Sequence, residues 1–363
     1  MSSVEDAEAI HREAIVVVGH TDIIASNVDY FRATGERRVL ERRHLPTLRQ
    51  GGATVICDHL GGDTRYAYLP AIALTTSPLR RIMRVLDHAH CEAKESEAIV
   101  LVDTVDDIRR AKREGKIALI LCIEGASPLE DDLSYLRNFH RLGVRSLGLT
   151  HNWRNQVADG VMERSGGGLT HFGADVVREC QSLGILVDVS HLSDRGLEDV
   201  LSISTRPIIA SHSNARALRN HVRNLTDDQI RAIAQRGGVV GIHALNALVS
   251  DAAEPSISHV IQHIQHIANV GGIDCVGIGP DLMENWREDL YRSAAEGAQT
   301  FMSVPVKKMN FCYPKGFGSL AELPNITKGL VAVGFSRQDI EKVLGGNFMR
   351  LYAQMWPSRE TRA

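Results

Sequence analysis

The sequence predicts a (β/α)8 barrel of the TIM type, in the α/β class, because eight short apolar runs alternate with amphipathic stretches along the chain. Each run reads as near-continuous Val, Ile, Leu and Ala, which is typical of parallel strands buried on both faces. The runs cover residues 14–19, 53–57, 117–123, 144–150, 185–190, 207–211, 239–242 and 275–280. A doubly wound open sheet is the alternative, but eight strand and helix units favour a closed barrel.

Helix start and stop signals lie between most of these runs. Thr170 is suited to N-cap a helix over 174–183, and Gly184 is suited to end it. After the eighth run, residues 319–354 predict two extra C-terminal helices. No linker or charge run divides the sequence, so we predict one domain over residues 1–363.

The composition excludes several classes of protein. Lys and Arg number 41 against 44 Asp and Glu, and this balance gives no field that would attract nucleic acid or anionic lipid. The longest strongly apolar stretch, 117–123, is far shorter than a membrane-spanning helix. Residues 1–12 lack the pattern of a signal peptide, and the six cysteines are scattered, so we expect reduced thiols and a cytoplasmic protein.

Polar residues follow the apolar runs at the points where strands are predicted to end. In a barrel, these carboxyl ends meet at one face and carry the active site. A histidine at one strand end is usually structural, but here each of the eight predicted ends carries a histidine or a carboxylate. The residues are His20 and Asp22, Asp58 and His59, Glu124, His151, His191, His212, His243 and Asp281.

Five of these residues predict a centre for two metal ions. His20 and Asp22 are two apart on an extended segment, so both side chains point the same way and can hold one ion. His191 and His212 end adjacent predicted strands and can hold a second ion, with Glu124 placed to bridge the two. Imidazole and carboxylate ligands suit Zn²⁺, Mn²⁺ or Fe²⁺. Two ions about 3.5 to 4 Å apart can share a hydroxide, which predicts a hydrolase.

Short motifs surround these positions in a fixed order along nearly the whole chain. They are Gly19-His20-Thr21-Asp22, Ile123-Glu124-Gly125, Leu149-Thr150-His151-Asn152, Val187-Asp188-Val189-Ser190-His191, Ser211-His212-Ser213-Asn214-Ala215-Arg216, Arg223-Asn224-Leu225, Gly277-Ile278-Gly279-Pro280-Asp281, Leu323-Pro324-Asn325 and Leu344-Gly345-Gly346-Asn347-Phe348. As an ordered set, they resemble the membrane (renal) dipeptidase family of zinc peptidases, within the amidohydrolase-like metal-dependent barrels.

The resemblance implies two zinc ions per chain, although other divalent metals suit the same residues. It places one zinc on His20 and Asp22 and the other on His191 and His212, with Glu124 bridging both. These are the five residues that the strand ends indicate independently.

The resemblance also implies roles for three further residues. His151 contacts the substrate and polarises the tetrahedral intermediate, Arg223 binds the substrate carboxylate, and Asp281 moves the proton. Each role suits the side chain, because Arg presents a planar fork to a carboxylate and a carboxylate can accept and return a proton. The family further implies a homodimer.

The expected function is therefore a binuclear zinc dipeptidase that cleaves small dipeptides by attack of a metal-bridging hydroxide. The segment Leu282-Met283-Glu284 stands where the family commonly has Phe-Asp-Gly, and Pro280 stands where Ser is usual. These departures leave open another substrate, such as a small amide, an N-acyl amino acid or a lactone. A third alternative is a non-catalytic binding barrel, against which the presence of Asp281 argues.

Two other histidine groups resemble metal motifs. His88 and His90 form a His-x-His pair, but they lie in a predicted helix over 82–98 rather than at a strand end. His259, His263 and His266 share one helical face, and we expect them on a helix outside the barrel.

Overall fold

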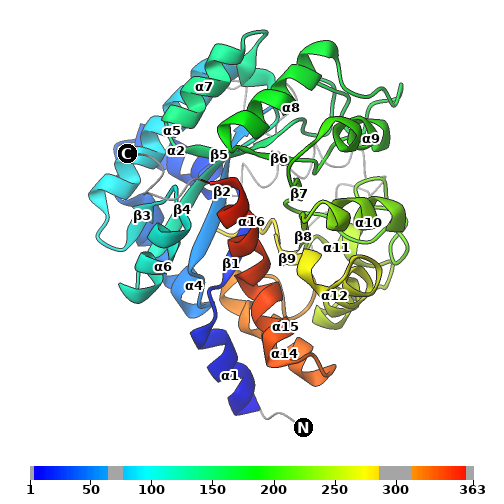
Figure 1. Cartoon of the computed structure of the whole chain (residues 1–363). Helices are drawn as coiled ribbons and strands as arrows, with labels where there is room; N and C mark the ends of the chain where they lie inside the picture. The colour runs from blue at the N-terminus through cyan, green and yellow to red at the C-terminus, as the bar shows by residue number, and fades with distance from the viewer. Residues whose placement is uncertain (1–3, 64–76, 286–312, 357–363) are drawn as a thin grey trace.

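The computed structural model describes residues 4–63, 77–285 and 313–356, and its centre is a nearly closed barrel of eight parallel strands (Figure 1). In order around the barrel the strands are β1 (Val17–Thr21), β2 (Val55–Gly62), β4 (Ile117–Glu124), β5 (Val144–Gly148), β6 (Leu186–Asp188), β7 (Ile209–Ala210), β8 (Val239–Ile242) and β9 (Val276–Ile278). Each overlaps one predicted apolar run, so the predicted fold class is confirmed. The first and last strands lie together, since a Cβ atom added at Gly19 would stand 2.9 Å from the carbonyl oxygen of Ile278.

A ninth strand, β3 (Ile99–Leu101), was not predicted from the sequence. It pairs with residues Ile117 to Leu119 of β4, whereas β5 pairs with the second half of β4, from Leu121 to Glu124. Strand β3 therefore extends the sheet beside the barrel and adds nothing to the rim where the strands end. Its signal is a short apolar run at 98–102.

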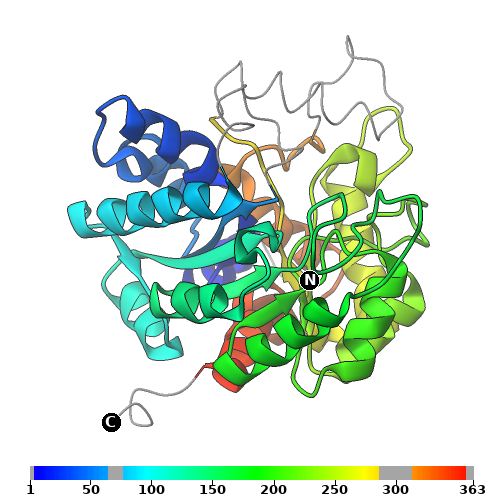
Figure 2. The same ribbon diagram turned by 90° about the horizontal axis from the view of Figure 1, so that it is seen from above.

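Helices surround the barrel in the positions that the alternating pattern predicts (Figures 1 and 2). Thr170 N-caps α8 by accepting a hydrogen bond from the Gly173 amide, and Gly184 ends it with a φ of +77°. The α-helices of the described residues are α1 (Val4–Glu13), α2 (Asp29–Ala33), α3 (Val39–Arg43), α4 (Leu45–Gln50), α5 (Pro78–Glu95), α6 (Val105–Arg113), α7 (Leu133–Arg141), α8 (His171–Leu183), α9 (Asp194–Ile203), α10 (Asp227–Gln235), α11 (Asn246–Val249), α12 (Ile257–Gly271), α14 (Pro324–Ala332), α15 (Arg337–Glu341) and α16 (Asn347–Met355). Within the described residues, no helix combines the length and the apolar character needed to cross a bilayer.

Residues 313–356 form three α-helices, where the sequence predicted two over 319–354, and the last of them closes one end of the barrel. In Figure 1, α16 lies across the strands, and its Phe348, Leu351 and Tyr352 join a buried cluster with the first residues of several strands. A Cβ atom at Gly19 would come within 2.5 Å of the Phe348 ring. Glycine on β1 therefore makes room for this plug at the amino ends of the strands, and the opposite face is left for the polar residues.

Strand β2 is longer than its apolar run, which changes the position of the residues after it. The sequence predicted an end near Cys57, with Asp58 and His59 at the rim, but β2 continues to Gly62. His59 is consequently buried inside the barrel, and its ring stacks on that of His20 with centroids 3.8 Å apart. Asp63 takes the place at the rim.

Candidate metal centre and active site

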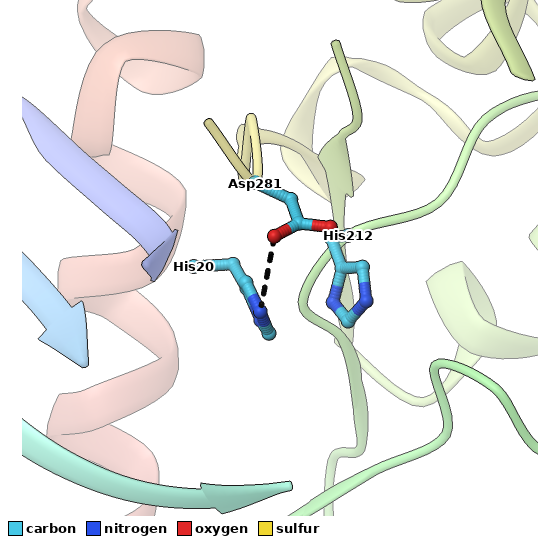
Figure 3. A group of neighbouring side chains, drawn as sticks. All are labelled: His20, His212 and Asp281. Carbon is cyan, nitrogen blue, oxygen red and sulfur yellow. Dashed lines mark ion pairs between the residues drawn. The ribbon is translucent and has the colours of Figure 1, made fainter. Parts of the chain in front are cut away.

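The strand ends bring six polar residues into one cluster at the carboxyl face of the barrel. Among the described residues, three overlapping groups each have candidate ligand atoms within 4.8 Å of one another. They are His20, Asp22 and Glu124; Glu124, His191 and His212; and His20, His212 and Asp281. Figure 3 shows the last group, with Asp281 placed between the two imidazoles. All five ligands predicted from the sequence thus lie together. The pattern of strand ends predicted that they meet at one face, but not the distances between their side chains.

Glu124 lies between the two predicted pairs of ligands. Its Oε1 is 3.1 Å from Nε2 of His191, 3.4 Å from Nε2 of His212 and 3.9 Å from Nε2 of His20. Nε2 of His20 is in turn 3.6 Å from Oδ1 of Asp22. One carboxylate therefore faces both the pair from β1 and the pair that follows β6 and β7.

Hydrogen bonds behind the histidines leave their Nε2 atoms facing the centre. Nδ1 of His191 donates to Oδ1 of Asn152 at 2.7 Å, and Nδ1 of His212 lies 2.8 Å from Oγ of Ser211. Such partners fix the ring orientation and leave the Nε2 lone pair for a ligand. Nε2 of His20 is buried and has no hydrogen-bond partner among the residues that the structure describes.

The electrostatics of the cluster also fit divalent cations. Burial, together with repulsion from Asp22 and Asp281, raises the pKa of Glu124 well above its usual range. Burial lowers the pKa values of His191 and His212, so both rings are neutral, which is the form that binds metal. Converging carboxylates and facing lone pairs repel one another unless cations lie among them. The donor set of imidazole and carboxylate suits zinc and related metals.

The three residues expected to act on the substrate also lie beside this centre. The His151 ring is 4.4 Å from that of His191, measured between centroids. Arg223 is buried, and its guanidinium donates to the carbonyl oxygen of His212 at 3.3 Å. Oδ1 of Asp281 lies 3.7 Å from Nε2 of His20. Burial, followed by the positive charge of Arg223, lowers the pKa of His151 to about 4.

Asp63 is a site residue that the sequence did not reveal. Its carboxylate accepts hydrogen bonds from the amides of His151 and Ser127 and from the side chain of Asn155. Asp63 therefore fixes the segment that carries His151. A Cβ atom at Gly125, where φ is +95°, would come within 2.3 Å of this carboxylate, so glycine is required there. The signal that could have revealed Asp63 is its place directly after β2, which the short apolar run hid.

Two residues of the cluster have left-handed backbone conformations that are uncommon outside glycine. The φ angle is +66° at His191 and +54° at Asp281. Such conformations cost of the order of 1–3 kcal/mol each and persist where the surrounding structure holds them. Both residues lie in loops shortly after a strand. The left-handed backbone directs each side chain towards the cluster, which a continued strand conformation would not do.

The other histidine groups lie outside this centre. His88 and His90 are on α5, as predicted, with His88 Nδ1 3.1 Å from Oδ1 of Asp29. His263 is buried on α12, where Nδ1 accepts from the Ala215 amide and Nε2 donates to the Val249 carbonyl. His266 pairs with Asp227.

A model of the membrane dipeptidase family, peptidase family M19, matches residues 4–286 of the chain. The chain belongs to the membrane dipeptidase family. The resemblance seen in its sequence motifs is confirmed by this match, which extends over most of the barrel.

A curated relative agrees with that assignment. The dipeptidase tcpJ of Claviceps purpurea (strain 20.1) is 30% identical over 263 residues, which are 72% of this chain and 56% of the relative. The chain thus spans about half the length of that curated relative.

Solved structures share the fold. An amidohydrolase from Pseudomonas aeruginosa is 24% identical with a TM-score of 0.79, covering 96% of this chain and 99% of its own. A metallopeptidase from Rhodobacter sphaeroides, liganded with a phosphinate mimic of the dipeptide L-Ala-D-Ala, is 24% identical with a TM-score of 0.77, covering 95% and 100%. The probable dipeptidase PvdM from Pseudomonas aeruginosa is 21% identical with a TM-score of 0.81, covering 99% of each chain.

Proposed function

We propose that this family member is a dipeptidase that binds two zinc ions and hydrolyses the peptide bond of small dipeptides by attack of hydroxide. The observation that supports this most directly is the position of Glu124, whose Oε1 lies within 3.9 Å of Nε2 of His191, His212 and His20. We assign His20 and Asp22 to one ion, His191 and His212 to the other, and Glu124 to both.

When bound, two divalent ions lower the pKa of a shared water towards neutrality and polarise the carbonyl group under attack. The chain supplies the remaining functions. Arg223, which is buried beside the centre, binds the free carboxylate of the dipeptide and orients the peptide bond. Asp281 accepts the proton of the attacking water at Oδ1 and returns it to the leaving amine. His151 is neutral at pH 7 and donates to the oxygen on which negative charge develops.

A second candidate keeps the metals and changes the substrate. Leu282 is buried directly after Asp281, and Glu284 accepts hydrogen bonds from the Ser319 hydroxyl and the Leu320 amide. Burial and hydrogen bonds therefore hold the altered segment in place directly after Asp281. Because this segment differs from the one common in the family, it is compatible with a different substrate, such as another small amide, an N-acyl amino acid or a lactone.

Metal analysis and a substrate panel test these proposals together. We expect close to two zinc ions per chain and turnover of dipeptides, detected by ninhydrin. The panel varies both side chains and includes L and D residues at the C-terminal position, since a structural relative is liganded with a mimic of L-Ala-D-Ala. It also contains dipeptide amides, N-acyl amino acids and lactones. If the protein binds two metals but turns over only the dipeptide amides, the N-acyl amino acids or the lactones, the second candidate is favoured.

A homodimer and a cytoplasmic location remain proposals from the sequence and the family. Light scattering coupled to size-exclusion chromatography tests the first, and fractionation of cells that express the protein tests the second.

A further inference from the structure

His243 directly follows strand β8 and lies beside Asp281, and neither the predicted metal set nor the proposed catalytic roles include it. Its side chain is only 3% exposed. Nε2 of His243 lies 3.2 Å from Oδ2 of Asp281, which is a distance at which a ring N–H donates to a carboxylate. The contact therefore involves the oxygen of Asp281 that faces away from His20.

The backbone determines which nitrogen of His243 carries the proton. The amide of Leu245 donates to Nδ1 of His243 at 3.0 Å, so this nitrogen must present a lone pair. In a neutral imidazole the proton is then on Nε2, the atom that faces Asp281. A nitrogen that carries a proton cannot bind a metal, and among the described residues the candidate metal groups leave out His243.

The position of His243 is fixed on both sides. Asn214 accepts from the amide of His243 and donates to its carbonyl group, both at 3.1 Å. The amide of the next residue, Ala244, donates to the carbonyl oxygen of Pro280 at 3.0 Å. A backbone hydrogen bond thus joins the segments that follow β8 and β9, next to the contact between His243 and Asp281.

Asp281 needs such support because its backbone is left-handed, with a φ of +54°, and its carboxylate is surrounded by candidate ligands. A carboxylate can rotate about its terminal bond, and either oxygen could then turn towards a metal. A donor on Oδ2 holds the group so that Oδ1 faces the centre, 3.7 Å from Nε2 of His20.

We propose that His243 is a positioning residue, which holds the carboxylate of Asp281 through an Nε2–H donor so that Oδ1 is presented for proton transfer. This inference rests on the proposed function for its kinetic consequence, but not for the hydrogen bond itself. It adds a residue to the machinery of the site without adding a metal ligand.

Kinetics of two variants test the role. His243→Met keeps the volume and removes the donor, so kcat should fall about 10- to 100-fold with KM changed less than about threefold. His243→Gln keeps an N–H at similar reach and should restore kcat to within about fivefold of the native value. His90→Met, on α5, is the matched control and should leave kcat unchanged. In an Asp281→Asn background, His243→Met should have little further effect.

Several outcomes would overturn the proposal. One is loss of metal from His243→Met. Another is a kcat for His243→Gln that is no higher than that of His243→Met. The third is a fall in kcat on His243→Met that is as large in the Asp281→Asn background as in the native protein.

A spectroscopic measurement on the native protein is independent of activity. In protein labelled with ¹⁵N-histidine, the His243 signals, assigned by their absence from His243→Gln, should show a protonated Nε2 and an unprotonated Nδ1. The Nε2 signal should shift in Asp281→Asn. The opposite tautomer would contradict the proposal even if no dipeptide is a substrate, whereas native protein that shows the expected tautomer but turns over no dipeptide would contradict only the proposed function.

Discussion

Nε2 of His191 and Nε2 of His212 lie 2.8 Å apart, with each ring held from behind through its Nδ1 atom. Two lone pairs at this distance repel each other unless a cation or a proton lies between them. Burial lowers the pKa values of both rings, which disfavours the proton. The pair is therefore arranged for a metal ion, and Glu124 lies beside it as a shared ligand.

Replacing Glu124 with glutamine should weaken both metals together. A neutral amide oxygen is a poorer ligand and cannot neutralise two cations, so the affinity for each ion should fall roughly tenfold or more. Metal content after dialysis against graded chelator measures both sites. Glu198→Gln, an exposed change on α9, should leave metal content unchanged. If one ion is lost while the other binds as before, Glu124 does not bridge.

Asn152 should affect one metal site more than the other. Because its Oδ1 accepts the Nδ1 proton of His191, Asn152→Ala releases that ring, and the loss of such a partner typically reduces metal affinity about 10- to 100-fold. The ion assigned to His20 and Asp22 should be retained. Titration of the metal-free variant with zinc, followed by calorimetry, separates the two sites, and Asn138→Ala on the exposed face of α7 is the control. Equal weakening of both sites would argue against separate ligand pairs.

The sequence predicts the metal centre better than the parts around it, for identifiable physical reasons. His20 and Asp22 could be paired because the period of a strand fixes the direction of side chains two apart. His59 could not be placed, because an apolar run that ends at Cys57 does not reveal that β2 continues to Gly62. Asp63 was missed for the same reason.

Residues that reach the site from loops depend on tertiary contacts. Arg223 lies in the segment after β7, and only its burial and its contact with the His212 carbonyl place it beside the centre. The sequence motif suggested a role for it, but no periodicity could place it. The Nε2–H of His243 likewise depends on the Leu245 amide, whose direction is set by the loop after β8.

His151 should act on the substrate without holding a metal. His151→Ala is expected to keep the full metal content and to lower kcat by on the order of 10²-fold, as does removal of a donor to a developing oxyanion. His171→Ala, at the exposed start of α8, is the matched control. Zinc analysis and steady-state kinetics on the same preparations give both quantities. Depleted zinc in His151→Ala would move this residue into the ligand set.

His263 should make stability depend on pH below neutrality. Burial lowers its pKa from 6.5 to about 4, so between these values the unfolded chain binds the proton and the folded protein does not. The stability that the neutral ring provides is therefore complete above pH 6.5 and is lost as pH falls towards 4. From pH 7 to pH 5 the loss is about 2 kcal/mol.

A double comparison isolates this effect from other titrating groups. His263→Met should be less stable than the native protein at pH 7, because the Ala215 amide and the Val249 carbonyl lose their partner. The difference in the free energy of unfolding between the two proteins should narrow by about 2 kcal/mol at pH 5, since only the native protein has a histidine with a lowered pKa at this position. Urea unfolding of the metal-free proteins at both pH values measures the gap. A constant gap would show that His263 titrates normally in the fold.

Arg223 should distinguish a substrate with a free carboxylate, such as a dipeptide, from the candidate substrates that lack one, because its proposed partner is that carboxylate. The guanidinium is buried beside the His212 carbonyl, where a charge-assisted hydrogen bond is strong. Arg223→Ala should therefore reduce kcat/KM for a free dipeptide by about 30- to 1000-fold, which is roughly 2 to 4 kcal/mol. A dipeptide amide should already be a poor substrate of the native protein and should lose little more in the variant, because the group that Arg223 binds is missing. Arg231→Ala, at an exposed position on α10, is the control and should leave both substrates unaffected. If the acid and the amide lose activity equally, Arg223 does not bind the substrate carboxylate, and a substrate without a free carboxylate becomes the better assignment for this site.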